Sequence, residues 1–213
     1  MKDLSDYRKS YEKSELIETA IPDNPFELFA LWFQEAEAIG GTEEVNAMTI
    51  ATIGKDGFPK SRIVLLKQLT SEGFIFFTNY ESEKGKAIAD NPNVCLSFFW
   101  PYAERQVIIK GKAEKTSDEV SDAYFQSRPF RSQLGALASH QSEIISNREV
   151  LEDKVKDLEE EFIGKVINRP EYWGGYLVKP YEIEFWQGRP NRLHDRIRFQ
   201  NRENTWKKDR LSS

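Results

Sequence analysis

A run of short segments with strand composition, separated by turn residues, is the feature that most restricts the fold of this chain. Lys55-Asp56-Gly57-Phe58 separates the first two of these segments, and Asp-Gly is the pair that favours a tight hairpin turn. Strands that follow one another so closely, with few helices between them, predict an antiparallel barrel. The expected strands cover residues 46–54, 59–69, 73–79, 94–100 and 106–115.

Helices are expected at the periphery of these strands, which makes the fold class mainly β with peripheral helices (α+β). The first begins at Asn24-Pro25, because Asn is a good N-cap and Pro suits the first helical position. It ends at Gly40-Gly41, where glycine permits the left-handed turn that closes a helix. Further helices are expected at residues 82–90, 117–126, 133–138 and 147–165.

Length and composition predict a single globular domain with an N-terminal extension. The chain has 213 residues, of which 39% are hydrophobic, enough to bury a sizeable core. Residues 1–22 are polar and read as an arm or lid, or else as a loosely held terminus, and residues 23–213 as one domain. The single cysteine, Cys95, lies in an apolar run and reads as a buried thiol in a reducing compartment. Because no stretch resembles a signal peptide or a membrane span, a cytoplasmic protein is expected.

Residues 169–211 concentrate aromatic and basic side chains, and four short strands are expected there. Three of the five tryptophans fall in this part. Residues 189–210 hold eight Lys or Arg and only three acidic residues, although the formal net charge of the whole chain is −5. If residues 192–196 are extended, Arg192, His194 and Arg196 point to one face. Such a face suits an anionic ligand that takes part in a proton transfer. The alternative is a solvated basic strand at a sheet edge.

The sequence lacks the motifs that are typical of several common chemistries. It lacks Gly-x-Gly-x-x-Gly and the phosphate-binding Gly-Lys-Ser/Thr loop. Two histidines, His140 and His194, and no cysteine cluster make a metal site unexpected. A second pair of cations, Arg62 and Lys67, brackets an apolar run. Strict alternation puts these two on opposite faces unless a bulge intervenes, and the alternative is a strand whose ends carry snorkelling side chains.

Eight motifs in a fixed order bear a resemblance to a known family. Together they closely resemble pyridoxine/pyridoxamine 5′-phosphate oxidases, from about Arg8 to Leu211. The motifs are Arg62-Ile63-Val64-Leu65-Leu66-Lys67, Phe77-Thr78-Asn79, Glu104-Arg105-Gln106-Val107, Tyr124-Phe125-Gln126-Ser127-Arg128-Pro129, Gln141-Ser142, Trp173-Gly174-Gly175-Tyr176, Ile183-Glu184-Phe185-Trp186-Gln187-Gly188 and Arg192-Leu193-His194-Asp195-Arg196.

The resemblance implies a split β-barrel that binds FMN and works as a homodimer, with two equivalent sites at the subunit interface. It implies oxidation of the 4′ carbon of pyridoxine 5′-phosphate or pyridoxamine 5′-phosphate to pyridoxal 5′-phosphate, in vitamin B6 synthesis and salvage. Hydride passes to FMN and then to dioxygen, which gives hydrogen peroxide, and the amine substrate also releases ammonia. No nucleic-acid or membrane partner is implied.

The resemblance also assigns residues, and Arg192 and His194 are the expected catalytic pair. Tyr124, Arg128 and Ser132 lie four apart, so one helical face could present them to a phosphate, although Pro129 complicates a continuous helix. The expected FMN-binding residues are Arg62, Ile63, Val64, Leu65, Leu66, Lys67, Phe77, Thr78, Lys84, Gln106, Gln141, Ser142, Trp186 and Arg196. The expected substrate-binding residues are Arg8, Tyr11, Lys67, Tyr124, Arg128, Ser132, Arg192 and His194.

One position departs from the family pattern, and three other functions stay open. Glu83 stands where the family usually has Arg, so its carboxylate must turn to solvent or leave FMN phosphate binding to Arg62 and Lys84, and weaker FMN binding is expected. The first alternative is a related split-barrel FMN oxidoreductase with another substrate, such as a phenazine-pathway oxidase. The second is a non-catalytic carrier of FMN or pyridoxal 5′-phosphate. A nucleic-acid role rests only on the basic C-terminal stretch.

Overall fold

The computed structural model describes residues 2–203 and 205–213, which form two compact units. Unit 1 takes in the chain up to Ile50, Cys95–Gly111 and Pro180–Ser213, and unit 2 takes in Ala51–Val94 and Lys112–Lys179. The expected domain boundary between residues 22 and 23 stays a prediction.

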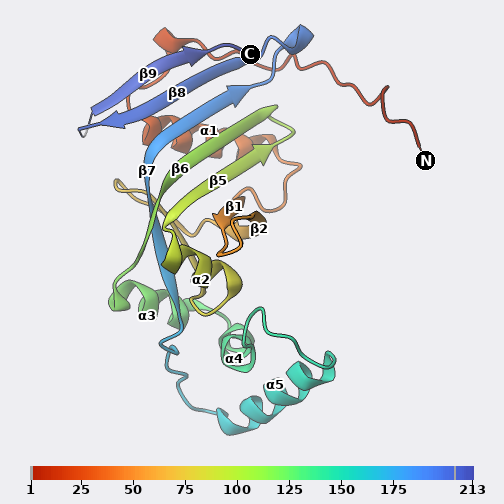
Figure 1. The fold of residues 1–213 in the computed structure, drawn as a ribbon, viewed down its shortest axis with the longest axis vertical. Coiled ribbons are helices and arrows are strands. Elements are labelled where there is room, and N and C mark those ends of the chain that lie inside the picture. Colours follow the sequence, from red (N-terminus) through yellow and green to blue (C-terminus); the bar gives the residue numbers. More distant parts are fainter. Residues whose placement is uncertain (1, 204) are drawn as a thin grey trace. The chain divides into compact units, whose positions relative to one another are not determined.

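Strands form most of the ordered structure, as expected (Figure 1). In hydrogen-bonded order they run β2-β1-β5-β6-β7-β4-β3, with β8 beside β7 and β9 beside β8. The pairs of β7 with β4 and β8 are antiparallel, as are β3 with β4 and β8 with β9. The strands are β1 (Ala47–Ile53), β2 (Pro59–Leu65), β3 (Gln68–Leu69), β4 (Phe74–Asn79), β5 (Asn93–Trp100), β6 (Arg105–Lys115), β7 (Trp173–Gln187), β8 (Asp195–Arg202) and β9 (Thr205–Leu211).

The first three helices begin after a side chain that caps them, whereas the last two do not. Asn24 caps the first by accepting the N–H of Phe26 at 2.9 Å, and Gly40 ends it with a φ of 71°. Among the described residues no helix has the length and apolar character needed to cross a membrane. The helices are α1 (Pro25–Ile39), α2 (Glu83–Asp90), α3 (Asp118–Ser127), α4 (Phe130–Ala138) and α5 (Glu149–Glu161), with 3₁₀ turns η1 (Glu18–Ala20) and η2 (Pro190–Arg192).

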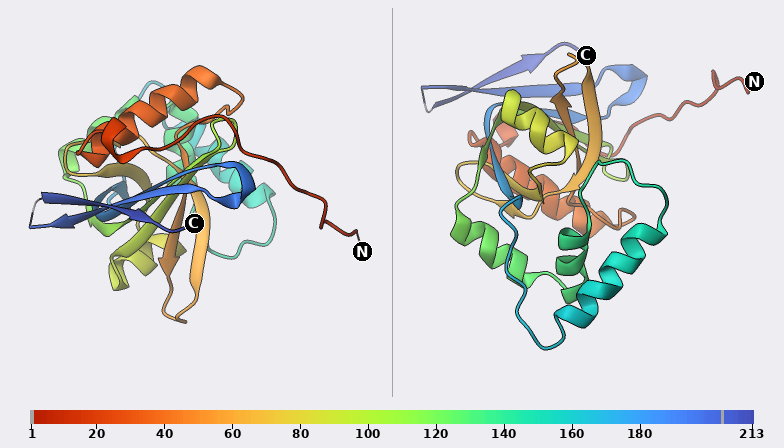
Figure 2. Two further views of the ribbon diagram at one scale, coloured as in Figure 1. Left: turned by 90° about the horizontal axis from the view of Figure 1, so that it is seen from above. Right: turned by 60° about the horizontal axis from the view of Figure 1, so that its bottom comes forward.

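The core of unit 1 lies between α1 and the strands that it covers (Figure 2). Trp32 of α1 packs edge-on against Phe185 of β7, with 5.2 Å between ring centroids, and Phe29 packs similarly against Phe98 of β5 at 5.0 Å. These rings are almost completely buried. The apolar stripe of α1 is therefore matched to aromatic positions on one face of the strands.

Unit 2 has a separate cluster of buried side chains: Phe125, Leu134, Ile167 and Trp173. Trp173 opens β7, whose first residues pair with β4 so that Gly174 faces Thr78 and Gly175 faces Phe77. Space is tight here, because a Cβ on Gly174 would lie 2.2 Å from the hydroxyl of Tyr80. The glycine pair after Trp173 therefore lets neighbouring side chains approach the strand backbone closely.

Two expectations for the C-terminal part are wrong. The described residues of this part form three strands instead of four short ones, because residues 173–187 make up the single 15-residue strand β7. Residues 192–194 are not extended either, since Arg192 ends η2 with a φ of 62° and β8 begins only at Asp195. Pro190 favours this turn, because its ring fixes φ and it has no N–H to give to a strand. The alternation of Arg192, His194 and Arg196 on one strand face therefore does not form.

Candidate active site

Unit 2 contains a cavity of about 340 Å³ that gathers many of the expected binding residues. It lies where β2, β4 and the start of α2 meet residues from α3 and the start of β7. Its lining residues are Ile63, Val64, Leu65, Lys67, Phe77, Thr78, Asn79, Lys84, Tyr124, Arg128, Gln141 and Trp173. The cavity is therefore built from six separate parts of the sequence.

Three parallel aromatic rings form one wall of this cavity. Phe77 stacks on Tyr124 with 3.9 Å between ring centroids and an angle of 17° between the ring planes. Phe77 also lies nearly parallel to Trp173, at 5.7 Å and 11°. Ordered π-faces of this kind suit a planar conjugated ligand.

The ammonium of Lys84 is the most buried charge at the cavity. Its Nζ donates to Thr78 Oγ1 at 3.0 Å, Gln141 Oε1 at 3.3 Å and Ser82 Oγ at 3.4 Å, all of them neutral oxygens. Burial, followed by repulsion from Arg62, lowers the pKa of Lys84 to about 8. A buried cation held by neutral dipoles favours the arrival of an anion.

Arg62 reaches the same part of unit 2 from β2, where its Nη1 donates to the buried Thr52 Oγ1 at 2.7 Å. Burial lowers its pKa, and the nearby Glu83 acts in the opposite direction. β2 ends at Leu65 and β3 begins at Gln68, so Lys67 follows a break in the strand. Lys67 lines the cavity together with Ile63 and Leu65, with which it alternates along the chain, whereas Arg62 is not among the lining residues.

Arg128 carries a buried nitrogen with no partner. Among the described residues, no hydrogen-bond acceptor meets its Nη1, while the guanidinium lies over the ring of Trp173 with 4.6 Å from Cζ to the centroid. Burial lowers the pKa of Arg128. Buried guanidinium nitrogens are normally hydrogen-bonded, so this one lacks the partner that such a group usually has.

The expected continuous helical face of Tyr124, Arg128 and Ser132 is wrong. α3 ends at Ser127, Arg128 has extended dihedral angles, and α4 begins at Phe130. Pro129 causes the break, because it disfavours a helical conformation at the residue before it. Tyr124 and Arg128 still line the cavity, whereas Ser132 lies in α4 and does not line it.

Glu83, the residue that departs from the family pattern, lies at the first position of α2 and is exposed. Its carboxylate pairs with the ammonium of Lys60 at 2.5 Å. Its backbone N–H donates to Ser142 Oγ at 3.3 Å. Glu83 is therefore turned to solvent, which is the first of the two sequence alternatives, and its carboxylate also has a cationic partner on β2.

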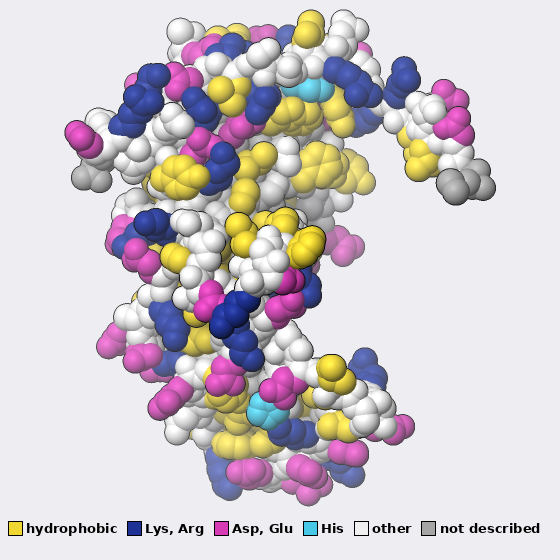
Figure 3. Space-filling view, viewed as in Figure 1, with side chains coloured by type: hydrophobic (Ala, Val, Ile, Leu, Met, Phe, Trp, Pro, Cys, Tyr) yellow, Lys and Arg dark blue, Asp and Glu magenta, His cyan; other side chains and the backbone are white. Residues whose placement is uncertain are grey.

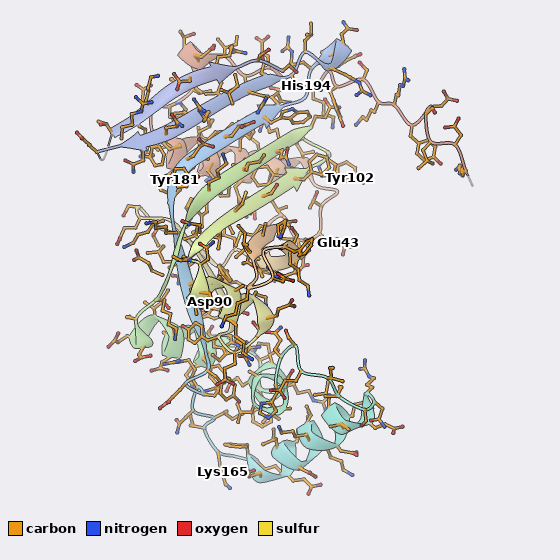
Figure 4. All side chains as sticks on the ribbon, viewed as in Figure 1. Glu43, Asp90, Tyr102, Lys165, Tyr181 and His194 are labelled. Carbon is orange, nitrogen blue, oxygen red and sulfur yellow. The ribbon has the colours of Figure 1, made fainter. Side chains whose placement is uncertain are left out.

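A second group of expected residues meets in unit 1. The rings of Trp186 and His194 lie 4.7 Å apart between centroids, and Tyr11 packs edge-on against Trp186 at 5.7 Å and against His194 at 5.8 Å. Figure 4 shows His194 at the same end of the unit 1 strands as Tyr102, which belongs to the turn between β5 and β6. Tyr11 and His194, 183 positions apart in the chain, thus belong to one aromatic cluster.

The hydrogen bonds of His194 define its tautomer. Its Nδ1 accepts the backbone N–H of Arg189 at 3.1 Å, which leaves the ring proton on Nε2. Burial, and next the charge of Arg192, lower the pKa of His194, although Asp195 acts the other way. At neutral pH, His194 is therefore a neutral imidazole that presents a hydrogen-bond donor at Nε2.

The basic C-terminal residues are mostly paired with acids of unit 1, and Figure 3 shows the two charges mixed over β8 and β9. Arg196 donates from Nε to Glu184 at 2.8 Å, and Arg210 binds both Asp195 and Glu18. The net charge of this stretch therefore does not mark an open anion site. The cations that line the cavity come from unit 2 instead.

The structure divides the expected site residues between the two units. Unit 1 holds Arg8, Tyr11, Gln106, Trp186, Arg192, His194 and Arg196, and Gln106 donates to Ser97 Oγ at 3.2 Å. In unit 2, Leu66 is buried and does not line the cavity. Asn79 and Trp173 do line it and were not assigned from the sequence. Both lie inside motifs quoted above, which was the available signal.

Comparisons with known proteins cover nearly the whole chain. The family described as "Pyridoxamine 5'-phosphate oxidase" matches residues 34–161, and the "Pyridoxine 5'-phosphate oxidase C-terminal dimerisation region" matches residues 173–213. Relatives called "Pyridoxine/pyridoxamine 5'-phosphate oxidase" are 67% identical in Flavobacterium johnsoniae, over 100% of both chains, and 52% identical in Christiangramia forsetii, over 99% of both.

Two solved structures are also similar. PhzG from Burkholderia lata, in complex with tetrahydrophenazine-1-carboxylic acid, has a TM-score of 0.86 and 28% identity and covers 93% of this chain and 98% of its own. An FMN-binding protein from Nostoc punctiforme related to pyridoxamine 5′-phosphate oxidase has a TM-score of 0.68 at 14% identity, covering 91% and 100%. They confirm the expected split-barrel fold class. The sequence matches decide the family: this chain belongs to the pyridoxine/pyridoxamine 5′-phosphate oxidase family of enzymes.

Proposed function

We propose that this chain is an FMN-dependent oxidase that converts pyridoxine 5′-phosphate or pyridoxamine 5′-phosphate to pyridoxal 5′-phosphate. The observation that carries the proposal is the buried, unpartnered Nη1 of Arg128 in a cavity that also contains Lys84 and a stacked aromatic wall. Such a cavity suits ligands that combine a planar ring with a phosphate. The names of relatives 52–67% identical to this chain support the same substrates.

The residues of the cavity fit an FMN group. Lys84, whose ammonium is held by neutral oxygens, and Arg62 would hold its phosphate, with the N-terminal turn of α2 beside them. The chemistry that FMN supplies when bound is acceptance of a hydride from the 4′ carbon and return of the electrons to dioxygen, which becomes hydrogen peroxide. The rest of the reaction falls to this chain's own side chains.

Arg128 and Lys67 would bind the phosphate of the substrate, since both line the cavity. Arg192 and His194 would orient the substrate ring. In the tautomer that the Arg189 N–H selects, His194 donates a hydrogen bond from Nε2 and has no free nitrogen to accept a proton. We therefore assign His194 to orientation of the substrate. With the amine substrate, a water molecule supplies the aldehyde oxygen and ammonia leaves.

We also propose a homodimer as the working form. The C-terminal residues 173–213 match a region described as a dimerisation region, which supports this assembly. The expected residues also fall into two groups, one in each unit. The dimer would hold two equivalent sites. Sedimentation of the FMN-loaded protein would test the assembly, and a monomer with full activity would contradict it.

The visible spectrum of the flavin tests the function directly. Purified protein with FMN, kept free of oxygen, should lose its yellow absorbance when pyridoxine 5′-phosphate is added and regain it in air, with release of hydrogen peroxide. A spectrum that stays yellow would agree with FMN binding but would show that pyridoxine 5′-phosphate is not a substrate.

A second candidate is an oxidoreductase of the phenazine pathway, favoured by the likeness to PhzG at 28% identity. The two candidates differ in the charge that the substrate must carry. Unphosphorylated pyridoxine should fail to bleach the flavin if Arg128 binds a phosphate, and tetrahydrophenazine-1-carboxylic acid should bleach it only under the second candidate.

The pairing of Glu83 with Lys60 gives a prediction about FMN affinity. Glu83→Arg should tighten FMN binding by about three- to tenfold, because it replaces an anion near the phosphate with a cation. Lys60→Met should weaken it about two- to threefold by leaving Glu83 without its partner. Quenching of flavin fluorescence measures both constants. Lys55→Met, which removes a similar exposed pair with Asp90, is the control, and equal affinities for all four proteins would reject the prediction.

The lowered pKa of Lys84 gives a pH dependence. Below about pH 6 the FMN phosphate loses its second charge, and above about 8 the free protein loses the Lys84 proton. FMN should therefore bind most tightly between these values, and the dissociation constant should rise by up to about tenfold per pH unit above 8. Fluorescence titrations from pH 5.5 to 9.5 would show this, and Lys84→Met should abolish the alkaline limb. A profile that the variant leaves unchanged would assign that limb to another group.

A further inference from the structure

Glu104 combines three unusual features at the turn between β5 and β6. Its side chain is an acid in a residue only 2% exposed, its φ is 56°, and its backbone carbonyl accepts the N–H of Gly188 at 2.8 Å. Positive φ is uncommon for a residue with a side chain, and buried carboxylates need partners. The neighbouring Arg105 supplies none, because it binds Gln187 and Glu35.

Among the described residues, all the partners of the Glu104 carboxylate belong to residues 9–13, which form part of the N-terminal arm. Oε2 accepts the backbone N–H groups of Glu12 at 2.9 Å and Lys13 at 3.1 Å, and Oε1 lies 3.3 Å from the ammonium of Lys9. Burial alone would raise the pKa of this carboxyl, yet these partners hold it below its ordinary value. Without residues 9–13 the carboxylate would have lost every partner that the described residues provide.

The contacts of this carboxylate with residues 9–13, the tether of the arm, are also the long-range polar contacts nearest the N-terminus in the described chain. Closer to α1, Asp195 accepts the N–H of Leu16 at 3.0 Å, and Arg210 donates to the Leu16 carbonyl at 2.7 Å. Between residues 2 and 8, the hydrogen bonds of the described chain are local, such as Arg8 Nε to the Ser5 carbonyl. Figure 1 shows this first part of the chain leading away from the strands.

The tether places one aromatic ring. Tyr11 lies between the tethered Lys9 and Glu12, and its ring covers Trp186 and His194. Gly188 leaves room for it, since a Cβ there would lie 2.7 Å from Tyr11 Cγ. Glu104 thus contacts the chain on both sides of the Tyr11 ring: its carboxylate binds residues that flank Tyr11, and its carbonyl binds Gly188 beneath the ring.

We propose that Glu104 is a positioning residue that fixes residues 9–13 and so holds Tyr11 over Trp186 and His194. The two hydrogen bonds and the ion pair of Glu104 are sufficient to infer that it holds residues 9–13 in place. The consequence for substrate binding rests on the proposed function, because it takes His194 and Tyr11 as substrate-binding residues. Removal of Glu104 frees the arm and raises the KM for the substrate phosphate ester, while leaving kcat nearly as it was.

Limited trypsin digestion of the FMN-loaded protein tests the tether without any turnover. Glu104→Ala should speed cleavage after Lys13 at least tenfold. Glu104→Gln should lie between Ala and wild type, because an amide oxygen can still accept the two N–H groups but not pair with Lys9. Cleavage after the exposed Lys165 of unit 2 is the internal reference. The matched control is Glu12→Gln, whose side chain is not part of the tether.

Two more variants keep the test decisive if Glu104→Ala fails to fold. Lys9→Met removes only the ion pair at an exposed ammonium, and should speed cleavage two- to threefold. Gly188→Ala leaves Glu104 in place but takes the space of Tyr11, and should loosen the arm as much as Glu104→Gln does. Cleavage after Lys13 at the wild-type rate in the folded Glu104 and Gly188 variants would overturn the proposal.

Kinetics then connect the tether to substrate. KM for pyridoxine 5′-phosphate should rise about fivefold or more in Glu104→Ala, with kcat changed less than twofold. A freed arm with an unchanged KM would overturn the positioning role. If the wild-type protein does not oxidise this substrate at all, the proposed function fails while the digestion result still decides the tether.

Discussion

Replacing Lys84 with methionine is expected to weaken FMN binding by about 100-fold. Lys84 is 8% exposed, and its ammonium is held only by neutral oxygens, so an incoming phosphate would meet a poorly hydrated cation. Hydrogen bonds to charged groups contribute about 1.5–3 kcal/mol, which corresponds to a factor of about 10–150 in affinity. Methionine keeps the length and apolar stem of the side chain. Titration of the apoprotein with FMN, followed by flavin fluorescence, gives the dissociation constants.

Lys86→Met is the matched control for this experiment. Lys86 belongs to the same helix, α2, but is exposed, so its loss should change FMN affinity by no more than about twofold. If the two variants bound FMN equally well, the phosphate would have to lie away from Lys84. The proposed use of this cavity for FMN would then be wrong, even if the protein were an oxidase.

Replacing Arg128 with methionine should raise the KM for pyridoxine 5′-phosphate by about 100-fold. The buried Nη1 has no partner among the described residues, and a substrate phosphate would give it one. The loss of a charge-assisted hydrogen bond to phosphate accounts for that size of effect. FMN affinity should stay within about threefold of wild type. Steady-state peroxide production measures KM, and flavin fluorescence measures FMN binding.

The same variant should not lose stability. A buried unpartnered nitrogen destabilises the folded protein by about 1–3 kcal/mol, so its removal in Arg128→Met is stabilising. The variant also loses the stacking of the guanidinium on Trp173, which stabilises the fold by about 0.5–2 kcal/mol. The free energy of unfolding of the apoprotein should therefore stay level or rise slightly, while activity falls. Urea denaturation measures it. Arg131→Met, which removes an exposed pair with Glu159, is the control for both measurements. A large loss of stability would give Arg128 a structural role in place of the binding role.

Local sequence was sufficient for most secondary structure. The Asn24 cap, the hairpin turn at Gly57 and the end of α1 at Gly40 form as expected, because capping and turn formation depend on a few adjacent residues. The same reasoning was wrong at residues 192–194. There, alternation predicted a strand, but Pro190 and positive φ values at Asn191 and Arg192 make a turn. Alternating side chains do not specify a strand when the backbone lacks a partner to pair with.

The sequence by itself determined most of the elements and, through its motifs, the family and the residue types needed to bind two phosphate-bearing ligands. Only the tertiary structure decided which cations are available. Arg210 is neutralised by Glu18, far away in the chain, while Arg128 keeps a buried nitrogen without a partner. Lys60 meets Glu83, and Glu104 meets residues 9–13, by the same long-range folding. Charge counts along a chain cannot contain such pairings, because the energy of a charge depends on its neighbours in space and on its burial.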